Sequence, residues 1–484
     1  MLYQIYVRSF ADSEGNGIGD LRGVIDRLEY LEWLGVDALW LSPITVSPDT
    51  DWGYDVSDYT DVQPALGTLE TLDELVAEAG ERGMRVILDL VPNHTSDRHP
   101  WFADARSSRD ARHRDWYVWA DPKPDGSPPN NWRSTFRGAP AWTLDEATGQ
   151  YYLHNFLPTQ PDLNWWHEEV RDAFDGILRF WLDRGIAGFR IDVAHGIVKD
   201  RELRDNPDPA VSTYNANRDD VHEVHKRFRR VVDEYEPERV LLGETWVMEP
   251  ERLARFYGNG SDELHLAFNF PFAFAPLEAA ALSAVVERTE AALPPGAWPV
   301  WMLSNHDIER FTTRTCGGDE RKIRCALLAL LTLRGTAVLY YGDELGMEQT
   351  VVPVERGRDV AGRDGARTPL PWTGDGGWRN PWLPFGDTRR NVADQRREPG
   401  STLRFVRKVI SLRRRSEDLL AGAYEPLEAL DGMWAWRRGE RTAVALNLSD
   451  QPRRHGLGGV VRLATDAASG GELRPWAGVV VEDV

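Results

Sequence analysis

The fold of this chain is decided by the stretch Gly188-Phe-Arg-Ile-Asp-Val-Ala-His195. Its apolar residues alternate with Arg190 and Asp192, which is the two-residue period of a β-strand. Burying a whole arginine and a whole carboxylate is costly, and even a paired charge seldom stabilises more than apolar residues of the same size. The stretch therefore holds either a buried structural ion pair or the end of a strand that carries a functional site.

Strand-like and helix-like segments alternate on both sides of this stretch. Strands are expected at 3–10, 37–42, 85–91, 188–193, 240–245, 264–270, 299–304 and 337–341. Helices are expected at 21–34, 69–82, 167–184, 218–235, 278–292, 320–333 and 401–415. Eight strands separated by helices and joined by right-handed crossovers predict an α/β fold, the (β/α)8 TIM barrel.

One irregular stretch and one change of pattern define the expected domains. Residues 95–164 are rich in Asp, Arg, Pro, Gly and Trp and too long for a plain loop, which indicates an inserted subdomain after the third strand. From about Leu420 the sequence turns to short strands without helices, which favours an antiparallel β-sandwich. The predicted domains are the barrel at 1–94 and 165–418, the inserted subdomain at 95–164 and the C-terminal β-sandwich at 419–484.

Composition narrows the class of partner. Lys and Arg number 57 against 77 Asp and Glu, a net charge of −20, which argues against nucleic acid or an anionic membrane as the partner. No apolar run is long enough to span a bilayer, and two cysteines give no disulfide framework, so a cytoplasmic protein is expected. The 20 tryptophans offer flat faces that suit sugar rings, although core packing accounts for most of them.

Four of the expected strands end in acidic or histidine side chains. These ends are Asp89-Leu-Val-Pro-Asn-His94, Arg190-Ile-Asp192, Gly243-Glu244-Thr245 and Ser304-Asn-His-Asp307. In a barrel they meet at one rim, where the active sites of this fold lie. Such a cluster could bind a metal ion, but the arginine two residues before Asp192 competes with a cation for that carboxylate. Carboxylates kept apart by arginine and histidine instead suit glycoside cleavage, which needs one ionised and one protonated acid.

The four strand ends, in this order and spacing, resemble those of the α-amylase superfamily, glycoside hydrolase family 13. Gln160-Pro-Asp-Leu-Asn164 is similar to the extra motif of its α-glucosidase and oligo-1,6-glucosidase branch. The resemblance covers nearly the whole chain. It implies that Asp192 is the nucleophile, Glu244 the general acid/base and Asp307 the stabiliser of the transition state.

The resemblance also implies a sugar-binding subsite beside these acids. The residues that match the family's binding positions are Asp51, Tyr54, His94, Phe156, Arg190, His306 and Arg367. Arg363-Asp-Gly-Ala-Arg367 is similar to the arginine motif of the branch, whose second arginine pairs with the early aspartate. Asp51 and Arg367 would then close the pocket behind one glucose and make the enzyme exo-acting.

The proposed roles make physical demands on the acids. The nucleophile must stay ionised, and we expect Arg190, on the same strand face, to lower the pKa of Asp192. The acid Glu244 is expected to keep its proton because other carboxylates surround it. Residues on adjacent strands can place these two carboxyl groups about 5 Å apart, the spacing of retaining enzymes.

The loop after the first strand has the pattern of a calcium site. Asp12-Ser-Glu14-Gly-Asn16-Gly-Ile18-Gly-Asp20 places an oxygen donor at every second position with glycines between. The branch often carries Asn and Asp where this chain has Glu14 and Asn16, which leaves the formal charge unchanged. We expect a structural Ca²⁺ and no organic cofactor; a solvated acidic turn is the alternative. The expected ligands are Asp12, Glu14, Asn16, Ile18 and Asp20.

The expected function is that of an exo-acting retaining α-glucosidase, releasing glucose from the non-reducing end of maltose and short malto-oligosaccharides. One alternative is an oligo-1,6-glucosidase acting on isomaltose. Another is a transglucosylase or isomerase acting on sucrose or maltose, of the trehalose synthase kind. Relatives that are non-catalytic partner subunits of transporters have lost the catalytic acids, which this chain retains. The sequence predicts no oligomeric state.

Linkage preference depends on conflicting signals around the nucleophile. In the branch that this chain resembles, valine directly after the nucleophile accompanies α-1,6 linkages, so Val193 favours isomaltose. The context Asp192-Val-Ala-His195 looks more like α-glucosidases that favour maltose. We expect maltose and short α-1,4 oligosaccharides to be preferred and α-1,6 substrates to be tolerated.

Overall fold

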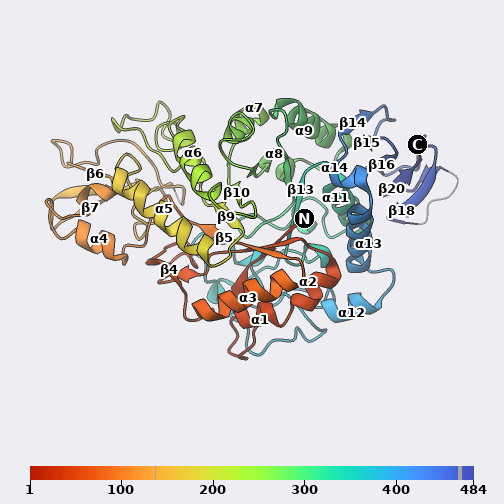
Figure 1. Ribbon diagram of the computed structural model, residues 1–484, viewed down its shortest axis with the longest axis horizontal. Helices are drawn as coiled ribbons and strands as arrows, with labels where there is room; N and C mark the ends of the chain where they lie inside the picture. The colour runs from red at the N-terminus through yellow and green to blue at the C-terminus, as the bar shows by residue number, and fades with distance from the viewer. Residues whose placement is uncertain (137, 467–470, 484) are drawn as a thin grey trace.

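The computed structural model describes residues 1–136, 138–466 and 471–483 and contains a closed barrel of eight parallel strands (Figure 1). The strands are β1 (Leu2–Ile5), β2 (Ala38–Leu41), β5 (Arg85–Leu90), β9 (Gly188–Ile191), β10 (Val240–Gly243), β11 (Leu266–Ala267), β12 (Val300–Met302) and β13 (Thr336–Tyr340). The sheet order is β11-β10-β9-β5-β2-β1-β13-β12, and a parallel bridge between Phe268 and Val300 joins its two edges. The predicted (β/α)8 barrel is thus confirmed.

The strand register places the charged residues of neighbouring strands at one level. Asp89 of β5 lies opposite Arg190 of β9, and Arg190 lies opposite Leu242 of β10. Partners in a parallel register point to the same face of the sheet. Asp89 and Arg190 therefore both point into the barrel, directly below the ends of β9 and β10.

Helices surround the barrel with the predicted alternation. They include α1 (Leu21–Ile25), α2 (Leu28–Leu34), α3 (Leu69–Glu81), α5 (Glu168–Asp183), α6 (Val221–Val232), α9 (Ala279–Ala292), α11 (Glu320–Thr332) and α13 (Thr402–Arg415). The single helix expected at 21–34 is wrong, because the backbone tightens after α1 into a turn in which Arg27 N–H donates to Val24.

The sixth strand is much shorter than the predicted 264–270. It ends at Ala267 because the Asn269 side chain accepts a hydrogen bond from Phe272 N–H and begins helix α8 (Phe270–Phe274). Side-chain capping of this kind ends a strand as effectively as it starts a helix. Further short helices on the rim are α7 (Pro250–Ala254) and α10 (Phe311–Arg314).

The stretch between β5 and α5 forms a separate layer beside the rim. It contains α4 (Pro100–Ala105) and the antiparallel sheet β6-β8-β7, formed by Trp119–Ala120, Gln150–Leu153 and Trp142–Asp145. A hairpin of β3 (Thr45–Val46) and β4 (Asp58–Val62) follows β2. Both segments rise over the carboxyl ends of the barrel strands, where they can wall a pocket.

The chain ends in antiparallel sheets, as predicted. A five-stranded sheet has the order β14 (Tyr424–Leu427), β15 (Met433–Arg438), β16 (Thr442–Asn447), β20 (Ala477–Glu482) and β18 (Val460–Ala464), and β17 (Arg453–Arg454) pairs with β19 (Glu472–Leu473). Helices α11 and α9 pack against these strands, and α14 (Glu417–Ala421) precedes them. The domain limits remain predictions, and 137, 467–470 and 484 lie outside the described residues.

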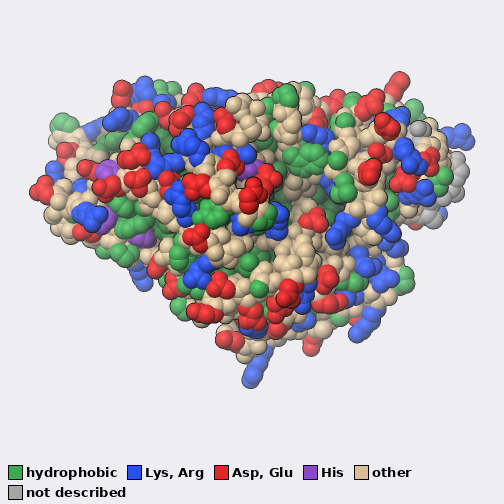
Figure 2. Space-filling model, viewed as in Figure 1, with side chains coloured by type: hydrophobic (Ala, Val, Ile, Leu, Met, Phe, Trp, Pro, Cys, Tyr) green, Lys and Arg blue, Asp and Glu red, His purple; other side chains and the backbone are tan. Residues whose placement is uncertain are grey.

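The surface carries acidic and basic side chains intermixed over the face seen in Figure 2. Among the described helices, none has both the length and the apolar character needed to cross a membrane.

Candidate active site

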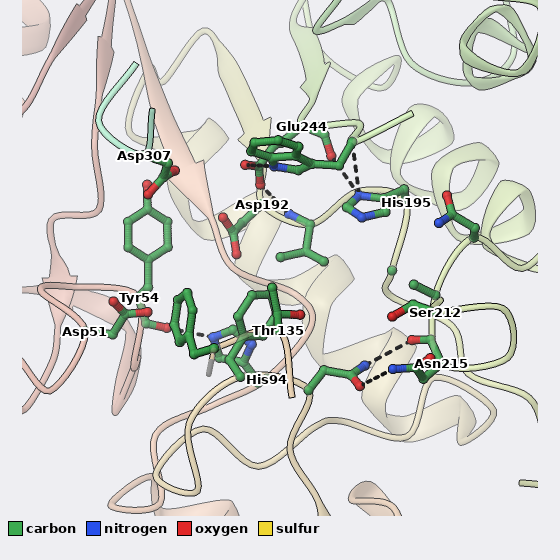
Figure 3. A pocket seen from close by; sticks show the side chains of 18 of the residues that line it. Asp51, Tyr54, His94, Thr135, Asp192, His195, Ser212, Asn215, Glu244 and Asp307 are labelled. Carbon is green, nitrogen blue, oxygen red and sulfur yellow. Dashed lines mark hydrogen bonds between the residues drawn. The ribbon is translucent and has the colours of Figure 1, made fainter. Parts of the chain in front are cut away.

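A cavity of about 410 Å³ lies at the carboxyl ends of the barrel strands, within the size range of small-molecule sites (Figure 3). The predicted site residues that line it are Asp51, Tyr54, His94, Phe156, Asp192, Glu244 and Asp307. Asp51, Tyr54 and Asp307 lie on one side, and Ser212 and Asn215, from the loop after β9, lie on the opposite side. The barrel, the inserted layer and the loop after β9 therefore build one pocket.

Arg190 lies beneath the pocket and contacts three carboxylates. Its Nη1 lies 2.6 Å from Asp89 and 2.7 Å from Asp192, and its Nη2 lies 2.9 Å from Glu244. The arginine is fully buried and does not line the cavity. A single guanidinium thus holds the two predicted catalytic carboxyl groups on neighbouring strands toward each other.

The shared arginine changes the expected electrostatics of the nucleophile. Burial raises the pKa of Asp192 well above its ordinary value; Arg190 opposes this shift, and Glu244, Asp89 and Asp307 add to it. Burial likewise raises the pKa of Asp89 to about 6, again against Arg190. Arg190 lowers the pKa of Asp192 as predicted, but burial and the three neighbouring carboxylates outweigh it, because one positive charge is divided among several carboxylates in a buried site.

Glu244 is fixed by hydrogen bonds to both of its carboxyl oxygens. Its Oε2 accepts from Val193 N–H at 2.9 Å, and its Oε1 accepts from Trp246 Nε1 at 3.0 Å. Val193 has φ 46°, a left-handed conformation that is a genuine outlier for a β-branched residue. Backbone strain of this kind is typical of functional sites, and here the strained residue donates its N–H to the carboxylate.

Asp307 is surrounded by the side chains of His306, Arg363 and Arg367. Burial opposes its ionisation, but His306, Arg363 and Arg367 outweigh burial and hold the pKa of Asp307 well below its usual range. Burial also lowers the pKa of His306 well below its ordinary value, against Asp307, which raises it. The His306 ring stacks on Tyr54 at 5.3 Å with an interplanar angle of 3°. Asp307 is therefore a carboxylate that stays ionised across the working pH range.

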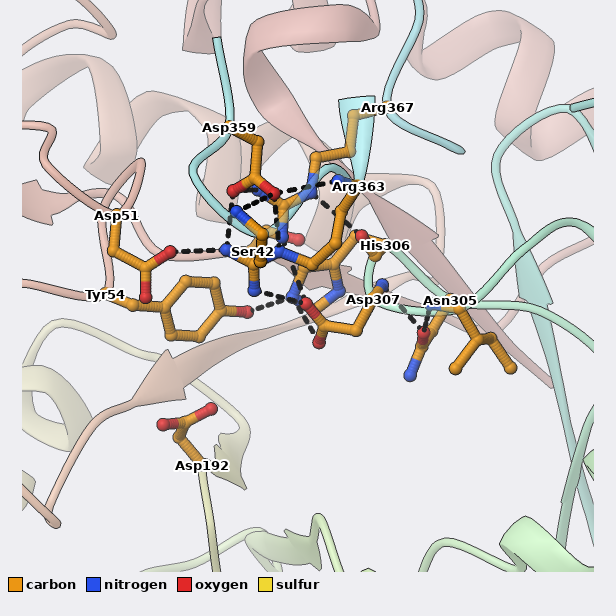
Figure 4. A network of polar contacts seen from close by, with 12 residues as sticks. Ser42, Asp51, Tyr54, Asp192, Asn305, His306, Asp307, Asp359, Arg363 and Arg367 are labelled. Carbon is orange, nitrogen blue, oxygen red and sulfur yellow. Dashed lines mark hydrogen bonds and ion pairs between the residues drawn. The ribbon is translucent and has the colours of Figure 1, made fainter. Parts of the chain in front are cut away.

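The pocket is closed by Arg363, not by the predicted Arg367 (Figure 4). Arg363 Nη2 lies 2.5 Å from Asp51, and its Nη1 lies 2.9 Å from Asp307. Arg367 is fully buried behind this pair, 3.0 Å from Asp307 and 3.3 Å from Asp359. The pairing of Asp51 with Arg367 is thus corrected. The two arginines lie four residues apart, and the one nearer the cavity meets Asp51.

The opposite side of Asp51 is held by the inserted layer. Gln160 Nε2 donates to Asp51 Oδ2 at 2.9 Å and lies 3.2 Å from His94 Nε2. The His94 ring contacts Phe156 at 5.2 Å between centroids. Asp51 is therefore fixed by Gln160 on one oxygen and by Arg363 on the other. Of the predicted binding residues, Arg190, His306 and Arg367 support this surface from behind without lining it.

Three residues with clear contacts at the site were not predicted. Asp359 accepts from Arg363 at 2.6 Å, but it lies in an irregular stretch that carries no periodic signal. Trp246 could have been noticed, because it follows Glu244 at a strand end. Lys199, buried, ties the loop after β9 to the inserted layer through Asp162 Oδ2 at 3.0 Å.

The predicted calcium loop is closed by its own hydrogen bonds. Asp12 accepts from Gly15 and Gly17 N–H at 2.7 and 2.8 Å, and Asp20 accepts from Gly23 N–H at the start of α1. Among the described residues no group of three His, Cys, Asp or Glu is arranged to hold a metal ion. Three carboxylates, the amide of Asn16 and a backbone carbonyl are chemically suited to calcium, and calcium at this loop stays a prediction.

Comparison with known proteins agrees with the geometry of the site. A family described as "Alpha amylase, catalytic domain" matches residues 4–422. The chain is 42% identical to a probable alpha-glucosidase of Rhizobium meliloti (strain 1021), covering 93% of this chain and 89% of that protein. It is 36% identical to an oligo-1,6-glucosidase of Heyndrickxia coagulans, covering 93% and 91%. The crystal structure of an alpha-glucosyl transfer enzyme, XgtA, superposes with a TM-score of 0.93 at 37% identity, over 100% and 98% of the two chains. The chain thus belongs to the α-amylase family of glycoside hydrolases.

Proposed function

We propose that the protein is an exo-acting retaining α-glucosidase that releases glucose from maltose and short malto-oligosaccharides. The observation that carries this proposal is the pair Asp51–Arg363 at one end of a pocket whose other walls present Asp192 and Glu244. A pocket closed at one end accepts a chain terminus rather than a chain interior. The two relatives named above are described as glucosidases, which supports the same class of substrate.

In the first step, Asp192 attacks the anomeric carbon and Glu244 protonates the leaving glycosidic oxygen. Asp192 Oδ1 accepts from Arg190, so Oδ2, which accepts from no described residue, is the attacking oxygen. Glu244 accepts from Val193 N–H on Oε2 and from Trp246 Nε1 on Oε1, and these two hydrogen bonds hold its carboxyl group in place to protonate the aglycone.

In the second step, Glu244 takes a proton from water, and the resulting hydroxide displaces Asp192 from the anomeric carbon. Two inversions at the same carbon give glucose with the α configuration of the substrate. Asp307 stays ionised throughout because His306 and two arginines hold its pKa low. Its negative charge stabilises the oxocarbenium-like charge that develops in both transition states.

Transfer to a sugar hydroxyl instead of water remains the alternative outcome of the same covalent intermediate. The similarity to a solved structure described as an alpha-glucosyl transfer enzyme supports transfer as this alternative. Chromatography of the products from maltose, isomaltose and sucrose separates the two outcomes. Hydrolysis gives monosaccharides alone, whereas transfer adds disaccharides or trisaccharides with new linkages.

The proposed substrates are neutral sugars, in keeping with a chain of net charge −20 that has little affinity for polyanions. We also propose a cytoplasmic location. Cys316 and Cys325 are both free and buried, which suits a reducing compartment.

Linkage preference is expected to favour maltose over isomaltose in kcat/KM. Val193 lines the cavity next to Glu244 and narrows the side on which the aglycone leaves. One methyl group in such a position discriminates by only about 1–3 kcal/mol, so the surrounding loops can override it. Steady-state kinetics on both disaccharides measure the preference. An isomaltose value ten times the maltose value would reverse it and make Val193 the deciding residue.

Calcium is expected to raise the melting temperature without changing the chemistry, if it binds the loop at residues 12–20. A ligand that binds only the native loop stabilises the fold by mass action. Asp12, Glu14, Asn16, Ile18 and Asp20 would hold the ion through carboxylate, amide and carbonyl oxygens. Thermal unfolding with calcium and with chelator tests this, and Asp12→Ala is expected to abolish the difference. Identical melting curves in calcium and chelator for the wild type would rule the site out.

A further inference from the structure

A second cavity, of about 430 Å³, lies between the barrel and the C-terminal sheet. Three segments that are far apart in the sequence contribute to its wall: the end of α8 with the loop that follows it, the α10–α11 region and Trp476. Figure 1 shows α8 and α9 between β10 and the C-terminal strands, and α9 packs against β14 and β15. The cavity wall includes the side chains of Phe274, Glu278, Arg314, Lys322 and Trp476.

A row of aromatic rings connects the active-site pocket to this cavity. Trp246, which donates to Glu244, stacks on Phe270 with centroids 4.0 Å apart and an interplanar angle of 18°. Phe274 lies 5.8 Å from Trp246 and 6.2 Å from Phe270. Trp246 is 38% exposed and Phe274 40% exposed. Phe270, between them, is fully buried, so the exposed rings are those of Trp246 and Phe274. Exposed aromatic surface beside two cavities indicates a binding surface.

The indole of Trp476 lines the same cavity as Phe274. Its backbone has φ 56°, a conformation that costs a non-glycine residue free energy. Its Nε1 donates to Asp450 at 2.7 Å, which fixes the orientation of the ring. Lys322 Nζ lies 4.3 Å from the ring centroid. A strained backbone and a fixed indole together present one aromatic platform to the cavity.

The polar groups of the cavity complement the rings. Arg314 lies 5.4 Å from the Phe274 ring, and its buried Nε finds no acceptor within the part of the chain that the structure describes. Glu278 supplies an acceptor, and Lys322 supplies further donors. Sugars present apolar ring faces and hydroxyls that both donate and accept. Aromatic platforms beside donors and an acceptor suit a sugar chain better than a purely apolar or purely anionic ligand.

We propose that this cavity binds the reducing-end portion of a longer α-1,4-glucan whose non-reducing end occupies the active-site pocket. The proposal rests on the exo-acting function argued above, because only a chain leaving the pocket past Glu244 crosses Trp246 and Phe274. The exposed rings of Trp246 and Phe274 lie between the site of cleavage and the cavity, and Trp476 lines the cavity itself. Affinity therefore rises with chain length once a substrate is long enough to reach the cavity.

The test compares KM for the series from maltose to maltoheptaose in Trp476→Gly and the wild type. Glycine adopts a φ of 56° without strain, so this change removes the ring and not the backbone conformation. The wild type is expected to show KM falling at least fivefold between maltose and maltoheptaose, and Trp476→Gly to show no such fall. Phe274→Ala, on the barrel side, is expected to remove it as well and provides a second variant.

Trp33→Ala is the matched control. Trp33 is also half-buried beneath cationic side chains, with Arg396 and Arg407 at 4.5 and 4.7 Å, but it lies on α2 and lines neither cavity. This variant is expected to keep the dependence of KM on chain length. A wild-type KM that does not depend on chain length, or a dependence that survives both Trp476→Gly and Phe274→Ala, would overturn the proposal.

Binding of β-cyclodextrin separates this inference from the glucosidase proposal. The ring has no non-reducing end, so it cannot enter a pocket closed by Asp51 and Arg363. Calorimetry is expected to detect β-cyclodextrin binding to the wild type and to Trp33→Ala, weakened at least fivefold in Trp476→Gly. Such binding in a protein that fails to cleave maltose would refute the proposed function and leave the second site standing. Cleavage of maltose without cyclodextrin binding would refute the second site alone.

Discussion

Asp192→Ala is expected to reduce kcat/KM on maltose by at least about 10⁴-fold, the scale on which covalent nucleophiles contribute. Without this carboxylate, no group in the pocket replaces it on the face of the sugar away from the leaving oxygen. Asp307, whose pKa is held well below its usual range, is bound by Arg363 and Arg367 and cannot take over the attack. Initial rates measured over a range of maltose concentrations give the loss.

Rescue of Asp192→Ala by a small external nucleophile tests whether the lost group is the nucleophile. Azide in the space vacated by the Asp192 side chain would attack the same carbon and expel the leaving group. It would yield β-glucosyl azide, the inverted product, in Asp192→Ala and not in the wild type. Unfolding curves of the variant establish that the fold survives. A variant that retains a tenth of the wild-type activity would remove Asp192 from the role of nucleophile.

Glu244→Gln is expected to lower kcat/KM on maltose by about 10²–10⁴-fold, the usual contribution of a general acid. Glutamine keeps the shape of the side chain, and its single oxygen can still accept from Trp246 Nε1 or from Val193 N–H, though not from both. It carries no proton that can be transferred to the leaving oxygen. The expected loss is therefore chemical rather than structural.

The dependence on the leaving group identifies the role of Glu244. For 4-nitrophenyl α-glucoside, the first step needs no proton donor, because nitrophenolate leaves unaided. The Gln variant should then form the glucosyl-enzyme at a near-normal rate and hydrolyse it slowly, since the base for the second step is missing. Stopped-flow absorbance would show a burst of nitrophenolate. Equal losses on maltose and on the nitrophenyl substrate, with no burst, would contradict the assignment.

The barrel and the location of its site could be predicted because they depend on local patterns. The period of two in the stretch at 188–193 fixes which side chains of β9 point inward, and the barrel places the ends of β5, β9, β10 and β12 on one rim. Strand alternation and strand ends are thus readable from residues close together in the sequence.

The features that could not be predicted depend on contacts between distant segments. Asp51 pairs with Arg363 and not with Arg367. This depends on the direction of an irregular turn, which no local periodicity in the sequence predicts. The left-handed φ of Val193 accompanies a hydrogen bond from its N–H to Glu244, which follows another strand. The raised pKa of Asp192 could not be predicted, because it depends on Asp89 and Glu244 sharing Arg190 with this carboxylate. In each case a third segment decides the outcome.

We propose that glucose leaves a closed pocket after two displacements at the same carbon. Proton NMR during the first turnovers of maltotetraose tests it most directly, because the anomeric protons of α- and β-glucose are resolved before mutarotation mixes them. We predict that α-glucose appears first, together with maltotriose. The first appearance of β-glucose would contradict the retaining mechanism, and the formation of maltose without glucose would contradict exo-action.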